Sequence, residues 1–116
     1  MLMNKRILVT GANGFIGSNI IAELLANDIP ITAIVRNKAN TKVLKKIKCY
    51  NVIPTDKYLD PTLIRKLSMS KPEFIIHCAW DKSNLVNTKN LINVLEMAQQ
   101  IDCKNFITIG SFEEYG

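Results

Sequence analysis

A short apolar segment followed by three regularly spaced glycines constrains the fold of this chain more than any other feature. Residues 7–10 are rich in β-branched side chains, and Gly11, Gly14 and Gly17 follow them. An apolar helical pattern then begins, with one predicted face made of Ile16, Ile20, Ile21, Leu24 and Leu25. The order of strand, glycine-rich turn and helix indicates a place where the backbone can approach a ligand closely.

The ligand that suits such a turn is a phosphate. Backbone N–H groups at a helix N-terminus point at the anion, and the helix dipole adds roughly half a positive charge there. Gly11 permits the tight turn, Gly14 lets a pyrophosphate approach, and Gly17 lets the helix pack against the strand. The alternative is a helix entry that merely needs tight turns. A second strand ending in a polar residue about 25 residues later favours dinucleotide binding.

Strand-like and helical patterns alternate along the rest of the chain. Strands are predicted at 6–10, 31–35, 50–54, 73–78 and 105–110, and helices at 15–27, 39–47, 60–69 and 84–102. Asp60 and Pro61 form a favourable helix start. The apolar stripe of the last helix is interpreted as core: Leu85, Thr88, Leu91, Leu95, Ala98 and Ile101. Right-handed crossovers predict a doubly wound, Rossmann-type parallel sheet of order 3-2-1-4-5.

Ligands bind such a sheet beyond the carboxyl ends of its strands, where the strand order reverses. The polar residues that follow the strands are therefore the candidates: Thr10 to Asn13, Arg36, Asn37, Asp56, Cys78 to Asp81, and Ser111.

Length and composition agree with one domain spanning residues 1–116. No apolar run approaches the ~20 residues of a membrane span, and the start of the chain leaves no room for a signal peptide. Cys49, Cys78 and Cys103 lack metal-type spacing. We therefore expect reduced, buried thiols, no metal site and a cytoplasmic location.

The net charge of +5 is unevenly spread. No acid lies between Asp28 and Asp56, whereas this stretch holds Arg36, Lys38, Lys42, Lys45, Lys46 and Lys48. A nucleic-acid surface is one interpretation. A solvated helix face is favoured over it, because no aromatic residues interleave for base stacking. We predict no nucleic-acid or membrane partner.

Several motifs, in the right order, resemble the extended short-chain dehydrogenase/reductase family of nucleotide-sugar epimerases, dehydratases and reductases. They are Thr10-Gly11-x-x-Gly14-x-x-Gly17, Ile76-His77-Cys78-Ala79-Trp80, Asn84-x-x-Asn87-Thr88, and Gly110-Ser111 followed by Tyr115-Gly116. The resemblance covers essentially the whole chain and implies an NAD(P)-binding Rossmann domain.

The resemblance implies cofactor contacts at Gly11, Asn13, Gly14, Phe15, Ile16, Gly17, Arg36, Asp56 and Ala79. Arg36 takes the place of an acid that usually binds the ribose 2′-hydroxyl of NAD. Because a guanidinium suits a 2′-phosphate, we expect NADP, with NAD as the alternative. Asp56 would lie near the adenine amine, with helix capping as the alternative, and Ala79 against the adenosine ribose.

For the chemistry, Ser111 matches the serine that orients the substrate; a strand-terminating serine is the alternative. His77 matches a structural histidine rather than a general base. Tyr115 is not followed by a lysine four residues later, and the sequence lacks the Tyr-x-x-x-Lys pair of the family. Only Asp81, Lys82 and Ser83 separate Trp80 from Asn84, fewer residues than in most members, so the substrate cleft is either rebuilt or incomplete.

We therefore expect the cofactor-binding half of a nucleotide-sugar epimerase, dehydratase or reductase, truncated after the fifth strand and inactive alone. The exposed edge of that strand predicts self-association. The alternatives are a non-catalytic dinucleotide-binding or redox-sensing module, and a Rossmann-like domain without a cofactor.

Overall fold

The computed structural model describes residues 6–79 and 83–109 and contains one parallel sheet. Its strands are β1 (Ile7–Thr10), β2 (Ile31–Val35), β3 (Val52–Pro54), β4 (Phe74–His77) and β5 (Asn105–Thr108). Its helices are α1 (Phe15–Ala26), α2 (Lys42–Lys46), α3 (Pro61–Ser70) and α4 (Asn84–Gln100). The strand order β3-β2-β1-β4-β5 confirms the predicted Rossmann-type topology.

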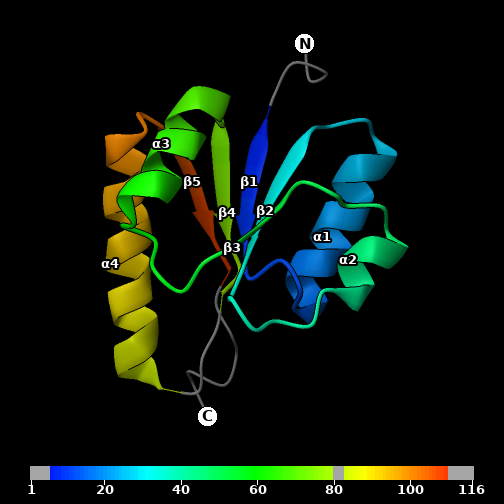
Figure 1. Ribbon diagram of the computed structural model, residues 1–116, viewed down its shortest axis with the longest axis horizontal. Helices are drawn as coiled ribbons and strands as arrows, with labels where there is room; N and C mark the ends of the chain where they lie inside the picture. Colours follow the sequence, from blue (N-terminus) through cyan, green and yellow to red (C-terminus); the bar gives the residue numbers. More distant parts are fainter. Residues whose placement is uncertain (1–5, 80–82, 110–116) are drawn as a thin grey trace.

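Helices cover both faces of the sheet, with α1 and α2 on one side and α3 and α4 on the other (Figure 1). Because successive side chains of a strand point to opposite faces, each face of the sheet contributes to its own hydrophobic core. Leu8 of β1 and Ile75 of β4 pack into the core under α3 and α4. Val9 of β1 and Ala33 of β2 pack into the core under α1 and α2. The carboxyl ends of all five strands therefore meet at one edge between these layers.

The predicted stripe of α4 is wrong in part. Leu85 and Leu95 are 65% and 45% exposed, whereas Val94, Met97 and Ala98 are buried. Apolar residues occupy more than one row of this helix, so their spacing alone could not decide which row faces the sheet. Packing decided it, and Ile92 is left on the outside with Leu85 and Leu95.

The element boundaries differ from the predictions at α2 and β3. The predicted helix 39–47 shortens to Lys42–Lys46, because Ala39 N donates to Arg36 O in a turn and Lys42 N donates to Asn40 Oδ1. The predicted strand 50–54 begins only at Val52. The predicted start of α3 is confirmed: Asp60 Oδ2 accepts a hydrogen bond from Leu63 N at 3.1 Å.

The three cysteines are free thiols, with Cys49 and Cys103 buried and Cys78 partly buried. Burial raises the pKa of each thiol above its ordinary value, so the thiolate, which is the reactive form, is disfavoured. Among the described helices, none combines the length and apolar character that crossing a bilayer requires.

Candidate functional site

The turn after β1 is built at the centre of the carboxyl edge of the sheet. Gly11 has φ +62°, a conformation that side chains with a Cβ rarely adopt. A Cβ at Gly11 would lie 2.5 Å from the backbone nitrogen of Ala79. The chain leaving β1 thus passes directly against the chain leaving β4, and only glycine fits between them.

The first turn of α1 packs against the same turn. A Cβ on Gly17 would lie 2.4 Å from Gly11 O, so the helix can approach this closely only because Gly17 has no side chain. Gly14 is the N-cap of α1, and in the described part of the chain no side chain caps the helix and no acid lies in its first turn. A Cβ on Gly14 would meet only Gly11 O, at 3.3 Å. This N-terminus keeps its positive dipole end open to an anion.

Three of the predicted cofactor-contact residues lie around this N-terminus. Phe15 is 85% and Ile16 47% exposed at the start of α1, and Asn13 is half-buried beside them. Ala12 N donates to Ile34 O at 3.3 Å, which ties the turn to β2. The glycine turn is therefore fixed to both neighbouring strands, β2 and β4.

The segment after β2 carries the basic residues. Arg36 follows the last residue of β2 directly, and Lys38, Lys42, Lys45, Lys46 and Lys48 are all exposed around α2. Because Ile34 of β2 is the register partner of Thr10, Arg36 lies at the same edge of the sheet as the glycine turn. This edge of the sheet therefore carries a basic residue as well as the α1 N-terminus.

Asp56, after β3, contacts this basic segment and does not cap α3. Its Oδ1 accepts a hydrogen bond from Asn37 N and its Oδ2 accepts one from Asn37 Nδ2, both at 3.1 Å. Asp60 is the residue that caps α3, so the capping alternative for Asp56 was wrong. The two oxygens keep further lone pairs for a ligand, since a carboxylate can accept about four hydrogen bonds.

Behind the glycine turn lies a buried polar network. Thr10 Oγ1 is 2.6 Å from His77 Nδ1 and also accepts a hydrogen bond from Cys78 N at 3.2 Å. The His77 ring packs edge-on against Tyr58 and at a tilt against Phe106. Burial lowers the pKa of His77, so the imidazole is neutral near pH 7, which agrees with a structural role.

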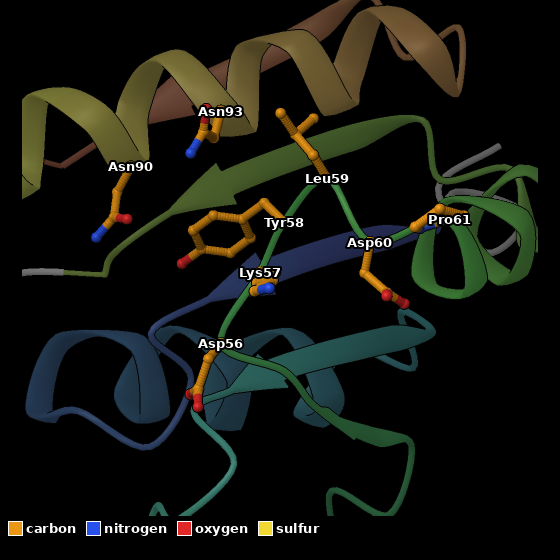
Figure 2. A pocket seen from close by; sticks show the side chains of 8 residues that line it. All are labelled: Asp56, Lys57, Tyr58, Leu59, Asp60, Pro61, Asn90 and Asn93. Atoms are coloured by element: carbon orange, nitrogen blue, oxygen red, sulfur yellow. The ribbon is translucent and has the colours of Figure 1, made fainter.

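Tyr58 joins this network from the loop between β3 and α3. Burial raises the pKa of its phenol, while hydrogen bonding with Thr10 and the positive charge of Arg36 act in the opposite direction. Figure 2 shows the Tyr58 ring between this loop and α4. Asp56 points away from the ring, toward the carboxyl end of β2.

A pocket of about 350 Å³ lies between the same loop and α4. Its lining residues are Asp56, Lys57, Tyr58, Leu59, Asp60, Pro61, Asn90 and Asn93. Sequence reasoning missed Tyr58, Asn90 and Asn93. The available signal was the position of Tyr58 two residues after Asp56, since loops that follow strands line this edge of the sheet.

Of the remaining predicted site residues, one lies within the described part of the chain and the others lie outside it. Ala79 is partly buried and lies against Gly11, as the geometry of the turn requires. Ser111, Tyr115 and the segment 80–82 lie outside the described residues.

Comparison with known proteins gives several solved structures that match nearly the whole chain, each over only part of its own length, and one shorter match to a further protein. UDP-glucose 4-epimerase from Stenotrophomonas maltophila, solved with bound NAD and formylated UDP-arabinopyranose, superposes with a TM-score of 0.78 at 20% identity, over 97% of this chain and 39% of that chain. Gre2 from Candida albicans in complex with NADPH gives a TM-score of 0.73 at 17% identity, over 93% and 37%. These likenesses show the fold.

Fatty acid hydroxylase uhd1 of Mycosarcoma maydis is 45% identical over 47 residues, which are 40% of this chain and 16% of that protein. This chain therefore spans about two fifths of the two structures and a smaller part of the hydroxylase.

The sequence model of the NAD dependent epimerase/dehydratase family matches residues 7–116. The matched range contains the glycine turn, the basic segment after β2 and the Thr10–His77 pair. The chain therefore belongs to the NAD dependent epimerase/dehydratase family.

Proposed function

We propose that this chain binds NADP(H), with NAD(H) as the alternative cofactor, at the glycine turn after β1. The observation that carries the proposal is the N-terminus of α1: it has no side-chain cap among the described residues, and Gly17 lets it pack against Gly11 O. A Cβ at either glycine would displace backbone atoms. This cradle fits a pyrophosphate, which needs backbone amides and close approach rather than side chains.

The proposal gives each surrounding residue a role that its position supports. The amides near Gly14, Phe15 and Ile16 hold the pyrophosphate, with Asn13 beside them. Arg36 binds the 2′-phosphate, since a guanidinium forms paired, charge-assisted hydrogen bonds with phosphate oxygens.

On the adenosine side, Asp56 receives the adenine amine and Ala79 lies against the ribose. The absence of acids between Asp28 and Asp56 supports the choice of NADP over NAD, because an acid there would repel the 2′-phosphate.

The substrate class we propose is a nucleotide sugar. The bound nicotinamide supplies a hydride acceptor or donor for a sugar carbon. The resemblance assigns to Ser111, which lies outside the described residues, a hydrogen bond to the sugar oxygen at that carbon. A solved structural neighbour holds NAD and a UDP-sugar together, which supports this class. We expect no turnover from the 116-residue chain alone, because no tyrosine in it is followed four residues later by a lysine.

Calorimetric titration of the 116-residue chain with NADPH and with NADH tests the cofactor proposal. We expect saturable binding of both, tighter for NADPH. Failure to bind either dinucleotide would overturn the proposal and favour a Rossmann-like domain without a cofactor.

Turnover assays on a panel of UDP-sugars, with cofactor present, test the substrate class. One sample in this assay is a fusion protein, in which the chain is joined to the C-terminal part of a family member that carries Tyr-x-x-x-Lys. We expect turnover only from the joined protein. If the joined protein binds cofactor but turns over no nucleotide sugar, a non-catalytic dinucleotide-binding module becomes the better assignment.

A further inference from the structure

The loops that follow β2 and β3 are joined by a paired hydrogen bond that the family match does not assign. Asn37 donates its backbone N–H to Asp56 Oδ1 and its side-chain Nδ2 to Asp56 Oδ2, each at 3.1 Å. We propose that this Asn37–Asp56 clasp positions Arg36 for the 2′-phosphate and so sets the preference for NADPH over NADH. The inference rests on the proposed cofactor site and deepens it.

The clasp extends the hydrogen bonding between β2 and β3 beyond their last backbone hydrogen bond. The last backbone link between β2 and β3 is Thr55 N to Val35 O, at 2.8 Å. β3 is three residues long and ends in Pro54, which has no N–H to donate. Beyond that point the Asp56 carboxylate takes the place of a backbone carbonyl and accepts the N–H of Asn37.

The backbone of Arg36 is thereby fixed on both sides. Val35 before it is held by the ladder, Asn37 after it is held by Asp56, and Arg36 O accepts a hydrogen bond from Ala39 N at 3.1 Å. An arginine side chain that leaves a fixed backbone loses less freedom when it binds a phosphate. Preorganisation at this residue favours the cofactor that carries the extra phosphate.

The clasp also fixes the direction of the negatively charged Asp56 carboxylate. Asp56 is the first acid after Asp28, and it is exposed within a strongly basic stretch. A carboxylate without partners beside Arg36 would compete for the guanidinium and repel a 2′-phosphate. Asn37 satisfies one lone pair on each oxygen and directs the carboxylate toward the loop, away from Tyr58, as Figure 2 shows.

The test measures the ratio of dissociation constants, NADH over NADPH, by calorimetry of the 116-residue chain and three variants: Asn37→Ala, Asp56→Ala and the double variant. We expect each single variant to lower the ratio about three- to tenfold, the size of one or two lost hydrogen bonds. The double variant should lower it no further than the larger single effect, because both residues act through one contact.

A matched control exists on the same two strands. Asn51 Nδ2 donates to Thr32 Oγ1 at 2.9 Å, with the same sequence separation of 19 residues and a similarly exposed position, at the opposite end of β2 and β3. Asn51→Ala should leave the ratio within twofold of the unaltered chain.

Three results would overturn the positioning role. One is an unchanged or raised ratio in Asp56→Ala, which would mean that Asn37 contacts the cofactor directly or that Asp56 only repels it. The second is an equal loss of affinity for both cofactors, as a purely structural contact would give. The third is strict additivity in the double variant. Failure of the unaltered chain to bind either cofactor overturns the proposed function as well, and is distinguishable because it needs no variant.

Discussion

Thr10 and His77, 67 positions apart in the sequence, share a buried hydrogen bond of 2.6 Å between Oγ1 and Nδ1. Parallel pairing of β1 with β4 places them side by side at the carboxyl ends of the two strands. Both side chains are nearly inaccessible to solvent. Because Thr10 directly precedes Gly11, the pair fixes the start of the glycine turn on its buried side.

Replacing Thr10 by valine keeps the shape of the side chain but removes the hydroxyl. Because His77 Nδ1 then lacks its partner in a buried position, we expect the free energy of unfolding to fall by about 1–3 kcal/mol, as measured by urea denaturation. Thr32→Val is the control: its bond to Asn51 is exposed, so the expected loss is below about 1 kcal/mol. Equal losses in the two variants would contradict a buried network.

The single histidine gives the stability of the chain a predictable pH dependence. Burial lowers the pKa of His77 below its ordinary value of 6.5 in the folded state, so the unfolded chain takes up the proton first. The contribution of neutral His77 to the free energy of unfolding is therefore fully present above about pH 6.5. It decreases as the pH falls toward the lowered pKa, by at most about 1.4 kcal/mol per pH unit.

Urea denaturation between about pH 7.5 and pH 5.5, above the range where most carboxylates titrate, measures this slope. His77→Asn should remove most of the slope. A slope that persists in the variant would assign it to other groups.

The three glycines should separate folding from binding. Gly11→Ala and Gly17→Ala place a Cβ about 2.5 Å or less from backbone atoms, so we expect each to destabilise the fold by about 2–4 kcal/mol. Gly14→Ala meets only one atom at 3.3 Å and should cost about 1 kcal/mol or less.

Because its methyl group would project where the pyrophosphate approaches, Gly14→Ala should still reduce NADPH affinity at least tenfold by calorimetry. A Gly14→Ala variant that binds NADPH normally would place the pyrophosphate elsewhere.

Arg36→Asp should shift preference from NADPH toward NADH. The substitution removes the guanidinium from the 2′-phosphate site and supplies a carboxylate that can accept hydrogen bonds from a ribose 2′-hydroxyl. We expect the affinity for NADPH to fall at least tenfold, by calorimetry at fixed salt, with little loss for NADH. Arg65→Asp makes the same charge change on the exposed face of α3 and should leave both affinities unchanged. Unchanged relative affinities in Arg36→Asp would eliminate this role.

Self-association through β5 remains a prediction. Within the described residues β5 pairs with β4 alone, and Ile107 on β5 is 49% exposed. An unpaired strand edge with an apolar side chain is a site for pairing with a second copy. We expect light scattering to show mass increasing with concentration, and Ile107→Lys to reduce this increase. Met69→Lys, on the exposed face of α3, should have no such effect. A monodisperse monomer at high concentration would contradict the prediction.

Much of the fold could be predicted because it depends on local patterns. Alternating strands and helices fixed the element order, and the handedness of crossovers fixed the order of the sheet. The cap of α3 followed from Asp60 and Pro61 alone. The phase of α4 was predicted only in part: Ala98 and Ile101 are buried as expected, but Leu85 and Leu95 also fall at helical spacing and are exposed.

The candidate site divides in the same way. The sequence by itself determined that Gly11, Gly14 and Gly17 form a tight turn between β1 and α1, since their conformational freedom and spacing act within a few residues. Only the tertiary structure decided that Asp56 bonds Asn37 instead of capping α3, that Tyr58 joins Thr10 and His77, and that Ala79 closes on Gly11. Each of these contacts joins segments brought together by strand pairing, so its partner is set by the register of the sheet and not by separation along the chain.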